Sequence, residues 1–284
     1  GLKAPLQKAP LVQFSDGEFN ITLKNYSQYK DQKIVIIQST SAPIHKHIFA
    51  IAFLAQQLKQ AGAQKIIGVI PYFGYSRQER SQIPSTPGHA KLVIDLLIQS
   101  GIDEFASIAV HNERIIDFSS VPFANLSATD VLAHQIKKNY QLQEICLSAP
   151  DKGAAALVDA LSDQLSVSRI AFEKERFAKD QTRIINSHGI CTGTQALIVD
   201  DIVATGSTAL SAAEKLHQQG KKVSGYFLHP VFAADAVARI EQSVFETVWV
   251  SNTIPLDHTA QQCTKIKTFD VSSVIIEYIN TQVG

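Results

Sequence analysis

The chain has 284 residues, and its 26 Lys and Arg residues balance its 26 Asp and Glu residues, so its formal net charge at pH 7 is zero. A neutral chain has no overall electrostatic attraction for nucleic acid or for an anionic membrane, and neither partner is expected. Hydrophobic residues make up 45% of the sequence and charged residues 18%, a composition typical of a globular protein with one large or two ordinary domains.

The three cysteines, Cys146, Cys191 and Cys263, are far apart in the sequence and odd in number. We therefore expect neither a disulfide framework nor a cysteine-based zinc site, and the expected compartment is a reducing cytoplasm. No apolar run has the length needed to cross a bilayer, and the first residues lack the pattern of a signal peptide.

Apolar runs of strand length alternate with amphipathic stretches of helix length. In the first part of the chain this pattern predicts strands at 34–38, 65–70 and 105–110, and helices at 48–60 and about 90–99. Continuous apolar strands joined by helices are typical of parallel sheets that are covered on both faces.

The pattern restarts after about Thr129, which predicts a second domain. Its predicted elements are a helix from about 129, strands at 145–148, 167–172, 196–200, 222–229 and 248–251, and helices at 154–165 and 208–219. The predicted fold is α/β, with tandem domains at 1–128 and 129–270. A last helix at 271–279, within 271–284, can pack on either domain. The polar segment 174–194 is predicted to be a long loop, which is usually functional or mobile.

The strongest local signal is the segment 196–208, ALIVDDIVATGST, in which a buried strand ends on two carboxylates and a hydroxyl-rich turn opens a helix. Amides and hydroxyls at a helix N-terminus can surround a phosphate, and paired carboxylates can accept hydrogen bonds from vicinal ribose hydroxyls. The alternative is a strand end followed by an N-cap cluster. The candidate residues for a ribose phosphate are Asp200, Asp201, Ala204, Thr205, Gly206, Ser207 and Thr208.

This segment resembles the 5-phosphoribosyl 1-diphosphate (PRPP) motif of type I phosphoribosyltransferases and of ribose-phosphate diphosphokinases (PRPP synthetases). Other segments resemble the second family and occur in its order: 14–18, 35–43, 69–79, 110–111, 149–153, 173–176, 229–230 and 252–256. The sequence is therefore identified as a member of the PRPP synthetase family from Phe14 onward.

The resemblance implies two phosphoribosyltransferase-like domains, each a mainly parallel sheet flanked by helices. The N-terminal domain would form the ATP side and the C-terminal domain the ribose 5-phosphate side. The implied reaction transfers the β,γ-diphosphoryl group of MgATP to the C1 hydroxyl of ribose 5-phosphate, which gives PRPP and AMP. Mg²⁺ is the implied cofactor.

The resemblance also implies roles for four residues outside the ribose-phosphate motif. Lys174 and Arg176 match a catalytic Lys-x-Arg pair, which would neutralise charge that develops on the transferred group. His111 matches a strand-terminal histidine at the magnesium–ATP site, and Asp151 matches a magnesium-binding aspartate, a suitable hard ligand. Taken alone, the first pair is typical of a solvated charge cluster, His111 of a packed residue and Asp151 of a turn.

The implied contacts to ATP come from two segments: Arg77, Gln78 and Glu79, and Phe14, Asp16 and Glu18. In the family the second segment reaches the nucleotide of a neighbouring subunit. The implied assembly is therefore a homo-oligomer in which the ATP site is shared between subunits. Without the resemblance, 14–18 is typical of an ordinary turn.

The sequence departs from the usual family pattern at several positions. Ala204 replaces an acidic residue, Glu79 replaces an aspartate, and the diphosphate loop is Asp151-Lys-Gly-Ala; the first and last of these are closer to archaeal-type members. The segment Ser81–Gly88 has no basic residue where phosphate-regulated members are rich in arginine. We therefore expect ADP to inhibit only in competition with ATP, and no requirement for added phosphate.

Two alternative functions remain. The first is a catalytically silent paralogue that regulates an active subunit. The second is a phosphoribosyltransferase that acts on a base. The retained Lys174, Arg176, His111 and Asp151 argue against the first. The second leaves the N-terminal half and the Lys-x-Arg pair without a role.

Overall fold

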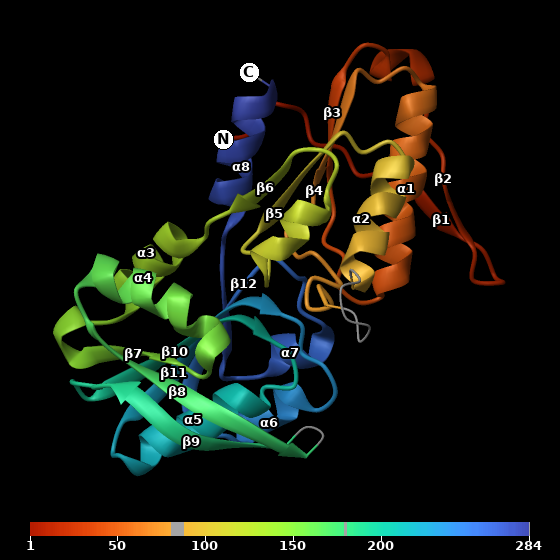
Figure 1. Cartoon of the computed structure of the whole chain (residues 1–284). Helices are drawn as coiled ribbons and strands as arrows, with labels where there is room; N and C mark the ends of the chain where they lie inside the picture. The colour runs from red at the N-terminus through yellow and green to blue at the C-terminus, as the bar shows by residue number, and fades with distance from the viewer. Residues whose placement is uncertain (81–87, 179–180, 284) are drawn as a thin grey trace. The chain divides into compact units, whose positions relative to one another are not determined.

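The computed structural model describes residues 1–80, 88–178 and 181–283, and for residues 174–185 and 283 it describes the backbone alone (Figure 1). The chain divides into two compact units. The first unit is Gly1–Ser127 together with Ser272–Gly284, and the second unit is Ala128–Val271. Each unit has its own mainly parallel sheet and its own buried hydrophobic clusters.

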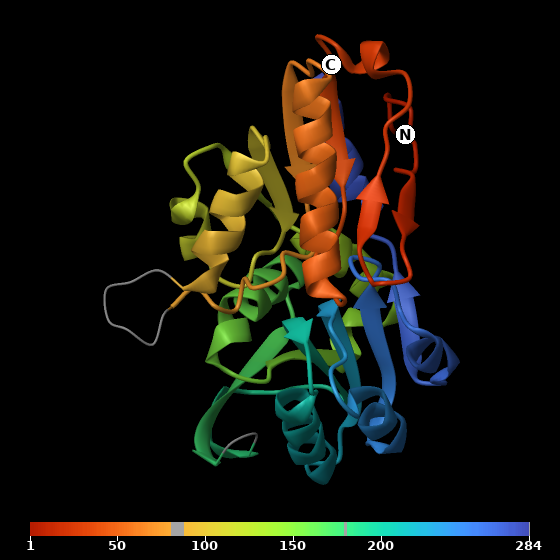
Figure 2. The same ribbon diagram turned by 90° about the vertical axis from the view of Figure 1, so that its right-hand side faces the viewer.

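The first unit is built on a four-stranded parallel sheet with the strand order β3-β4-β5-β6. Two further strands, β1 and β2, form a separate antiparallel hairpin, which Figure 2 shows beside α1. The elements of this unit are β1 (Leu11–Gln13), β2 (Phe19–Ile21), η1 (Tyr26–Tyr29), β3 (Lys33–Ile37), α1 (Ile44–Gln60), β4 (Lys65–Val69), α2 (His89–Gln99), β5 (Glu104–Ile108), η2 (Glu113–Phe118), β6 (Phe123–Leu126) and α8 (Ser272–Val283).

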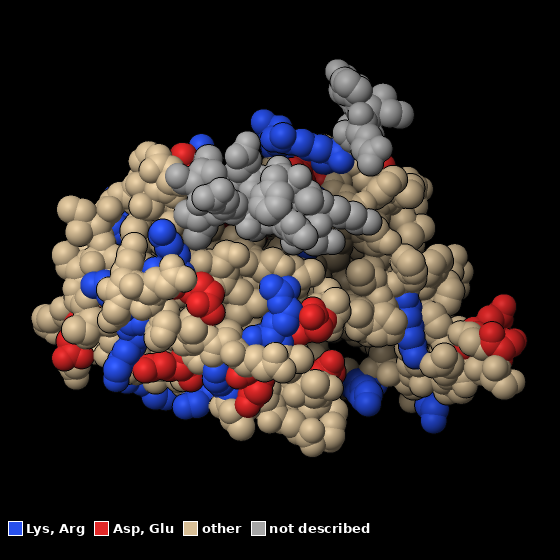
Figure 3. Space-filling model, turned by 90° about the horizontal axis from the view of Figure 1, so that it is seen from below, with Lys and Arg blue, Asp and Glu red and all other residues tan. Residues whose placement is uncertain are grey.

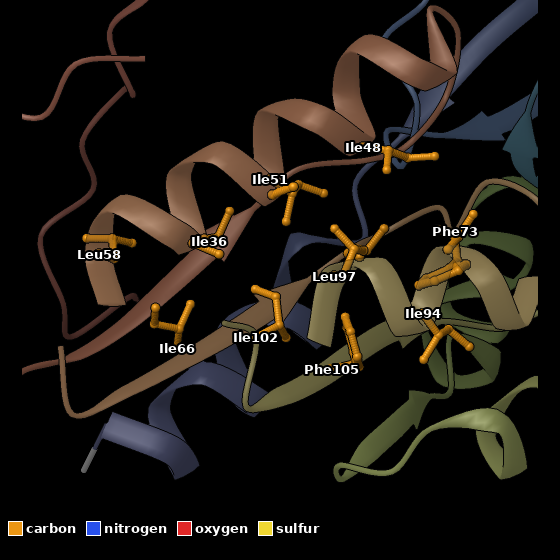
Figure 4. Close-up of a cluster of buried hydrophobic side chains, with 14 of the residues drawn as sticks. Ile36, Ile48, Ile51, Leu58, Ile66, Phe73, Ile94, Leu97, Ile102 and Phe105 are labelled. Atoms are coloured by element: carbon orange, nitrogen blue, oxygen red, sulfur yellow. The ribbon is translucent and has the colours of Figure 1, made fainter. Parts of the chain in front are cut away.

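Adjacent residues of β4 serve the two faces of this sheet. Ile66 belongs to the buried cluster that α1 and α2 cover, whereas Ile67 belongs to a second cluster with Ile279 of α8. Successive side chains of a strand point to opposite faces, so a continuous apolar run is buried on both sides. In Figure 4, Ile51 of α1 and Ile36 of β3 are among the side chains that meet in the first cluster. Each such side chain stabilises the fold by about 1.5–3 kcal/mol.

The C-terminal helix α8 is anchored to the sheet of the first unit by a polar contact as well as by apolar packing. The Tyr278 hydroxyl donates to the carboxylate of Glu104, which also accepts a hydrogen bond from Lys65. Burial alone would raise the pKa of the Glu104 carboxyl, but the two hydrogen bonds and the Lys65 charge hold it below its ordinary value. A buried carboxylate therefore stays ionised because two donors satisfy it.

The second unit is built on a seven-stranded sheet with the order β13-β12-β11-β10-β7-β8-β9. All neighbouring strands are parallel except β8 and β9, so the α/β class with parallel sheets is confirmed. The elements are α3 (Thr129–Asn139), η3 (Leu142–Glu144), β7 (Ile145–Ala149), η4 (Lys152–Ala154), α4 (Ala155–Leu165), β8 (Ser168–Ala178), β9 (Gln181–Gly189), β10 (Gln195–Val203), α5 (Ser207–Gln218), β11 (Lys222–Pro230), α6 (Ala236–Gln242), β12 (Phe245–Ser251), α7 (His258–Gln262) and β13 (Ile266–Phe269).

Helices cover both faces of this sheet. Figure 1 shows α3 and α4 on one side of it and α5 and α6 on the other. The buried face of α5 carries small residues, Ala209, Ala212 and Ala213, in one cluster with Phe227 and Phe245 of the sheet. Small helical residues let the helix approach the strands closely, which fixes the position of the α5 N-terminus at the end of β10.

The prediction of a loop at 174–194 is wrong for most of this segment, which forms β-strands. β8 continues to Ala178, and β9 returns beside it in the antiparallel direction from Gln181 to Gly189. The error has a physical cause. An antiparallel pair at the edge of a sheet does not need apolar residues on both faces, so its sequence lacks the continuous apolar run of a buried strand.

The sequence predicts no disulfide framework, yet the described residues contain one disulfide bond. The sulfur atoms of Cys146 and Cys191 are bonded, their Cα atoms are 5.3 Å apart, and Cys263 is the free cysteine. Cys146 lies on β7, and Cys191 follows the β8–β9 hairpin. The pairing depends on the path of that hairpin, which spacing in the sequence does not reveal.

The surface carries no strong excess of either charge on the face shown in Figure 3, where basic and acidic side chains are interspersed. This agrees with the formal net charge of zero. None of the helices in the described part of the chain is sufficiently long and apolar to span a membrane.

Candidate functional site

The connections of the second sheet change direction between β7 and β10. From β7 the chain passes to β8 on one side, whereas β10, β11, β12 and β13 follow one another on the other side. In open α/β sheets, ligands bind outside the carboxyl ends of the strands at such a switch point. Asp151 follows β7 there, and the segment Asp200–Thr208 ends β10 and opens α5.

The turn between β10 and α5, Ala204–Thr208, is named the phosphate loop below. Gly206 is buried and has a φ of 73°, a left-handed conformation that favours glycine. Helix α5 begins at Ser207, so the amides of its first turn point out of the helix N-terminus onto this loop. The hydroxyl oxygens of Thr205 and Ser207 are 3.1 Å apart. Amides and hydroxyls thus converge at one helix N-terminus, an arrangement that suits an anion.

Three half-buried carboxylates, those of Asp151, Asp200 and Asp201, gather at the same switch point. Burial raises the pKa of the Asp200 carboxyl well above its ordinary value, and the negative charges of Asp201 and Asp151 raise it further. The backbone N–H of Asp201 donates to Asp200 Oδ1 at 2.9 Å. This local excess of negative charge suits a divalent cation or the hydroxyl donors of a sugar.

The loop after β7 is tied to the neighbouring strand β8. Asp151 Oδ1 accepts a hydrogen bond from the N–H of Gly153 at 2.9 Å, and Lys152 Nζ lies 3.0 Å from Glu173 Oε1 of β8. The hydrogen bond from Lys152 holds the pKa of the Glu173 carboxyl below its ordinary value, and His188 of β9 contributes in the same direction. The Asp151 loop therefore contacts the residue that directly precedes Lys174.

Lys174 and Arg176 lie on β8, where the backbone pairs with β9. The last parallel pair between β7 and β8 joins Ala149 to Ala171, so β8 extends beyond the carboxyl end of β7. At about 3.3 Å per residue, the Lys174 backbone lies about 10 Å past that pair. The side chains of Lys174 and Arg176 belong to the part that the structure does not describe.

A second group of predicted site residues lies at the carboxyl ends of β4 and β5 in the first unit. Asn112 Nδ2 donates to Glu79 Oε1 at 3.3 Å, which joins the segment after β4 to the loop after β5. His111, which precedes Asn112, is exposed, as are Arg77 and Gln78. The structure therefore brings Arg77–Glu79 and the His111 loop together, and no sequence motif marks Asn112 as their link.

The segment Phe14–Glu18 forms the turn of the β1–β2 hairpin. The N–H of Phe14 donates to the Glu18 carbonyl at 2.8 Å, and the N–H of Glu18 donates to Asp16 Oδ1 at 3.0 Å. The side chain of Phe14 remains 51% exposed. A turn that holds an aromatic ring in solvent leaves its face open to a partner.

The predicted site residues thus form separate groups. The second unit brings together Asp151, Asp200, Asp201 and the phosphate loop, and the first unit brings together Arg77–Glu79 and the His111 loop. The segment 81–87, on which the regulatory expectation rests, lies outside the described residues. The phosphate loop also contacts Arg239, which the sequence does not identify as a site residue. Arg239 belongs to the short helix α6, which the apolar periodicity does not predict.

A preformed metal cage is not part of either group. Within residues 1–80, 88–178 and 181–283, no set of three or more His, Cys, Asp and Glu side chains is arranged to hold a metal ion. The carboxylates at the switch point still fit Mg²⁺, because this ion takes one or two carboxylates together with water and substrate phosphates.

The two mainly parallel sheets, the switch-point carboxylates and the phosphate loop define an α/β enzyme of the phosphoribosyltransferase-like class. The family model of the N-terminal domain of ribose phosphate pyrophosphokinase matches residues 1–101, and that of the phosphoribosyl synthetase-associated domain matches residues 148–282. The chain belongs to the ribose-phosphate pyrophosphokinase family.

The similarity to known proteins extends over nearly the whole chain. The ribose-phosphate pyrophosphokinase of Rhizobium meliloti is 31% identical over 98% of this chain and 90% of its own length. That of Ralstonia nicotianae is 33% identical over 97% of this chain and 87% of its own length. The crystal structure of phosphoribosylpyrophosphate synthetase from Mycobacterium smegmatis has the same fold, with a TM-score of 0.84, 21% identity, and coverage of 99% of this chain and 92% of that chain.

Proposed function

We propose that this chain is a ribose-phosphate diphosphokinase, which transfers the β,γ-diphosphoryl group of ATP to the C1 hydroxyl of ribose 5-phosphate. The products are PRPP and AMP. The observation that carries the proposal is the gathering of Asp151, Asp200 and Asp201 with the phosphate loop at the switch point of the second sheet. Membership of the ribose-phosphate pyrophosphokinase family supports the same reaction.

The second unit binds ribose 5-phosphate in this proposal. The 5-phosphate accepts hydrogen bonds from the amides of the phosphate loop and from the hydroxyls of Thr205, Ser207 and Thr208. Asp200 and Asp201 accept hydrogen bonds from the ribose hydroxyls, which offsets the repulsion between the two carboxylates. The small side chain of Ala204 leaves room beside the sugar.

The first unit supplies the contacts to ATP. Arg77, Gln78 and Glu79 contact the nucleotide, and His111 lies beside its phosphates. The link between Asn112 and Glu79 supports this grouping, because it holds the two segments together without a ligand. The exposed turn at 14–18 reaches the nucleotide of a neighbouring subunit, so that the working enzyme is a homo-oligomer.

The proposed cofactor is Mg²⁺, for which Asp151 in the second unit and His111 in the first unit are the proposed ligands, each together with substrate phosphates. When bound, it neutralises negative charge across the phosphates that react. The chain's own contribution is to position the two substrates and to supply the cations of Lys174 and Arg176 where charge develops on the transferred group. The proposed compartment is the cytoplasm.

Incubation of the purified chain with ATP, Mg²⁺ and ribose 5-phosphate tests the reaction. Phosphorus NMR is expected to show equal amounts of AMP and PRPP, and no ADP. Formation of ADP instead would mean transfer of a single phosphoryl group and would overturn the proposed chemistry. No turnover at all, in protein that binds both substrates by calorimetry, would favour the silent paralogue.

A further inference from the structure

A cation contacts the phosphate loop from outside the predicted motif. Arg239, half-buried on α6, donates from Nη1 to the Thr205 carbonyl oxygen at 3.2 Å and to Ser207 Oγ at 3.1 Å. Both acceptors belong to the turn that opens α5. One guanidinium therefore holds the turn at two points on either side of Gly206.

The electrostatics of the loop explain why a cation is needed there. The segment Asp200–Thr208 contains two aspartates and no Lys or Arg, so its side chains alone repel a phosphate dianion. The N-terminus of α5 offers only about half a positive charge. Arg239 adds a full positive charge, because its guanidinium stays protonated at every working pH.

The hydrogen bonds also orient the Ser207 hydroxyl. A serine hydroxyl has one proton to donate and two lone pairs that accept. Because Arg239 donates to Ser207 Oγ, one lone pair is occupied, and the hydroxyl proton is directed away from the guanidinium. The proton can then reach either Thr205 Oγ1, 3.1 Å away, or an anion in the loop.

We infer that Arg239 is a positioning residue for the phosphate group of the sugar substrate. It fixes the phosphate loop in its binding shape and directs the Ser207 hydroxyl proton toward the bound phosphate. This inference rests on the proposed function, in which the loop takes the 5-phosphate of ribose 5-phosphate.

The test compares Arg239→Gln and Arg239→Lys with Lys215→Gln, which removes one positive charge from an exposed position on α5. Arg239→Gln is expected to raise KM for ribose 5-phosphate about 10- to 100-fold, as expected for a lost interaction with a charged group. The KM for ATP and kcat at saturating sugar phosphate are expected to change less than threefold. Arg239→Lys keeps the charge and is expected to recover part of the loss. The control variant is expected to behave as wild type.

A ligand-induced shift in melting temperature gives a second readout that needs no turnover. Ribose 5-phosphate alone is expected to raise the melting temperature of wild type and of Lys215→Gln, and to have little effect on Arg239→Gln. If Arg239→Gln does not fold, the same comparison is made with Arg239→Lys, for which a smaller shift than that of wild type is expected.

A Ser207→Ala variant separates failure of this inference from failure of the proposed site. If Ser207→Ala weakens sugar-phosphate binding and Arg239→Gln does not, the inference is overturned and the proposed site stands. If neither variant affects that binding, the phosphate loop is not the sugar-phosphate site. If the Arg239 variants lower kcat and raise both KM values alike, Arg239 is only structural, and the inference is overturned.

Discussion

Asp151 follows β7, and Asp200 lies near the carboxyl end of the adjacent strand β10, where the charge of Asp151 helps to raise the pKa of the Asp200 carboxyl. Burial of Asp200 is the largest cause of the raised pKa, and the Asp201 carboxylate adds to it. Without a ligand, the site therefore holds like charges at a cost in stability. Such unfavourable clusters are typical of functional sites, where a ligand relieves the repulsion.

Asp200→Asn is expected to stabilise the unliganded protein. The folded-state pKa of Asp200 is raised, so its ionised form destabilises the fold, and the penalty grows as pH rises above the ordinary value of 3.8. A gain on the order of 1 kcal/mol would raise the melting temperature by about 2–4 °C at neutral pH. Thermal unfolding at several pH values, without Mg²⁺ or substrate, measures it.

The matched control is Asp235→Asn, which removes an exposed carboxylate from the same unit. It is expected to change the melting temperature by less than a degree. The stabilising effect of Mg²⁺ on Asp200→Asn is expected to be smaller than on wild type. A lower melting temperature for Asp200→Asn at every pH would show that the carboxylate stabilises the fold and that the repulsion is not important.

Loss of the Lys174 or Arg176 charge is expected to lower kcat with little change in either KM. The proposed role of both charges is in the transition state, so binding of the ground state should not depend on them. The expected loss is on the order of 10²–10³ for each alanine variant, by comparison with removal of one oxyanion donor. Steady-state kinetics with both substrates varied will measure it.

Arg169→Ala is the control for that pair, because it removes an arginine from the same strand. Its partners are Asp159 and Asp163 of α4, in exposed ion pairs of small energetic value. We expect its kcat to remain within a factor of two of wild type. Near-normal kcat in the Lys174→Ala/Arg176→Ala double variant would remove both residues from the mechanism.

The parts of the fold that the sequence predicts well are those with a strong apolar signal. The pattern predicts a strand at 65–70, and β4 spans Lys65–Val69, because both faces of this strand are buried. The turn from β10 into α5 is equally evident from the sequence, because its residue types report local structure. Gly206 allows the left-handed backbone of the turn, and the hydroxyl residues around it are typical of a helix N-terminus that binds an anion.

Features that depend on distant contacts are not evident from the sequence. Helix α6 has only seven residues, too few to show a helical period in the sequence. The sequence therefore does not indicate that Arg239 lies on a helix near the phosphate loop. The β8–β9 hairpin is polar, and the pairing of its strands decides its structure. The link between Asn112 and Glu79 needs the order β4-β5 within the sheet, which local patterns do not contain.

Tyr278→Phe is expected to destabilise the protein by about 1.5–3 kcal/mol, because the buried Glu104 carboxylate loses a charge-assisted hydrogen bond. The folded-state pKa of Glu104 is lowered, so this contribution is present above its ordinary value of 4.5 and is lost as pH falls through the folded-state pKa. The difference between wild type and variant should therefore be largest near neutral pH and small in acid. Denaturant unfolding at both pH values measures it.

Tyr26→Phe is the control for this change. The Tyr26 hydroxyl makes an exposed contact of 3.5 Å to Gln57, so its loss is expected to change stability by less than about 0.5 kcal/mol. Equal effects of the two substitutions would mean that the Tyr278 contact does not anchor α8.

The bond between Cys146 and Cys191 is expected to stabilise the second unit by about 2–4 kcal/mol. It closes a loop between residues 45 apart in sequence, and this loop contains Asp151 and the β8–β9 hairpin. Cross-linking a loop of this length lowers the conformational entropy of the unfolded chain, which is the main source of the expected gain. Protein purified without reductant should show one titratable thiol in denaturant, that of Cys263, and three after reduction.

Cys191→Ser provides the matched comparison for this bond. Its melting temperature is expected to equal that of reduced wild type and to be insensitive to reductant, whereas oxidised wild type should melt at a higher temperature. Because the cross-linked loop carries Lys174, kcat should also be compared between the oxidised and reduced protein. Three titratable thiols in unreduced protein would contradict the prediction, since they would show that the two sulfur atoms remain separate thiols in solution.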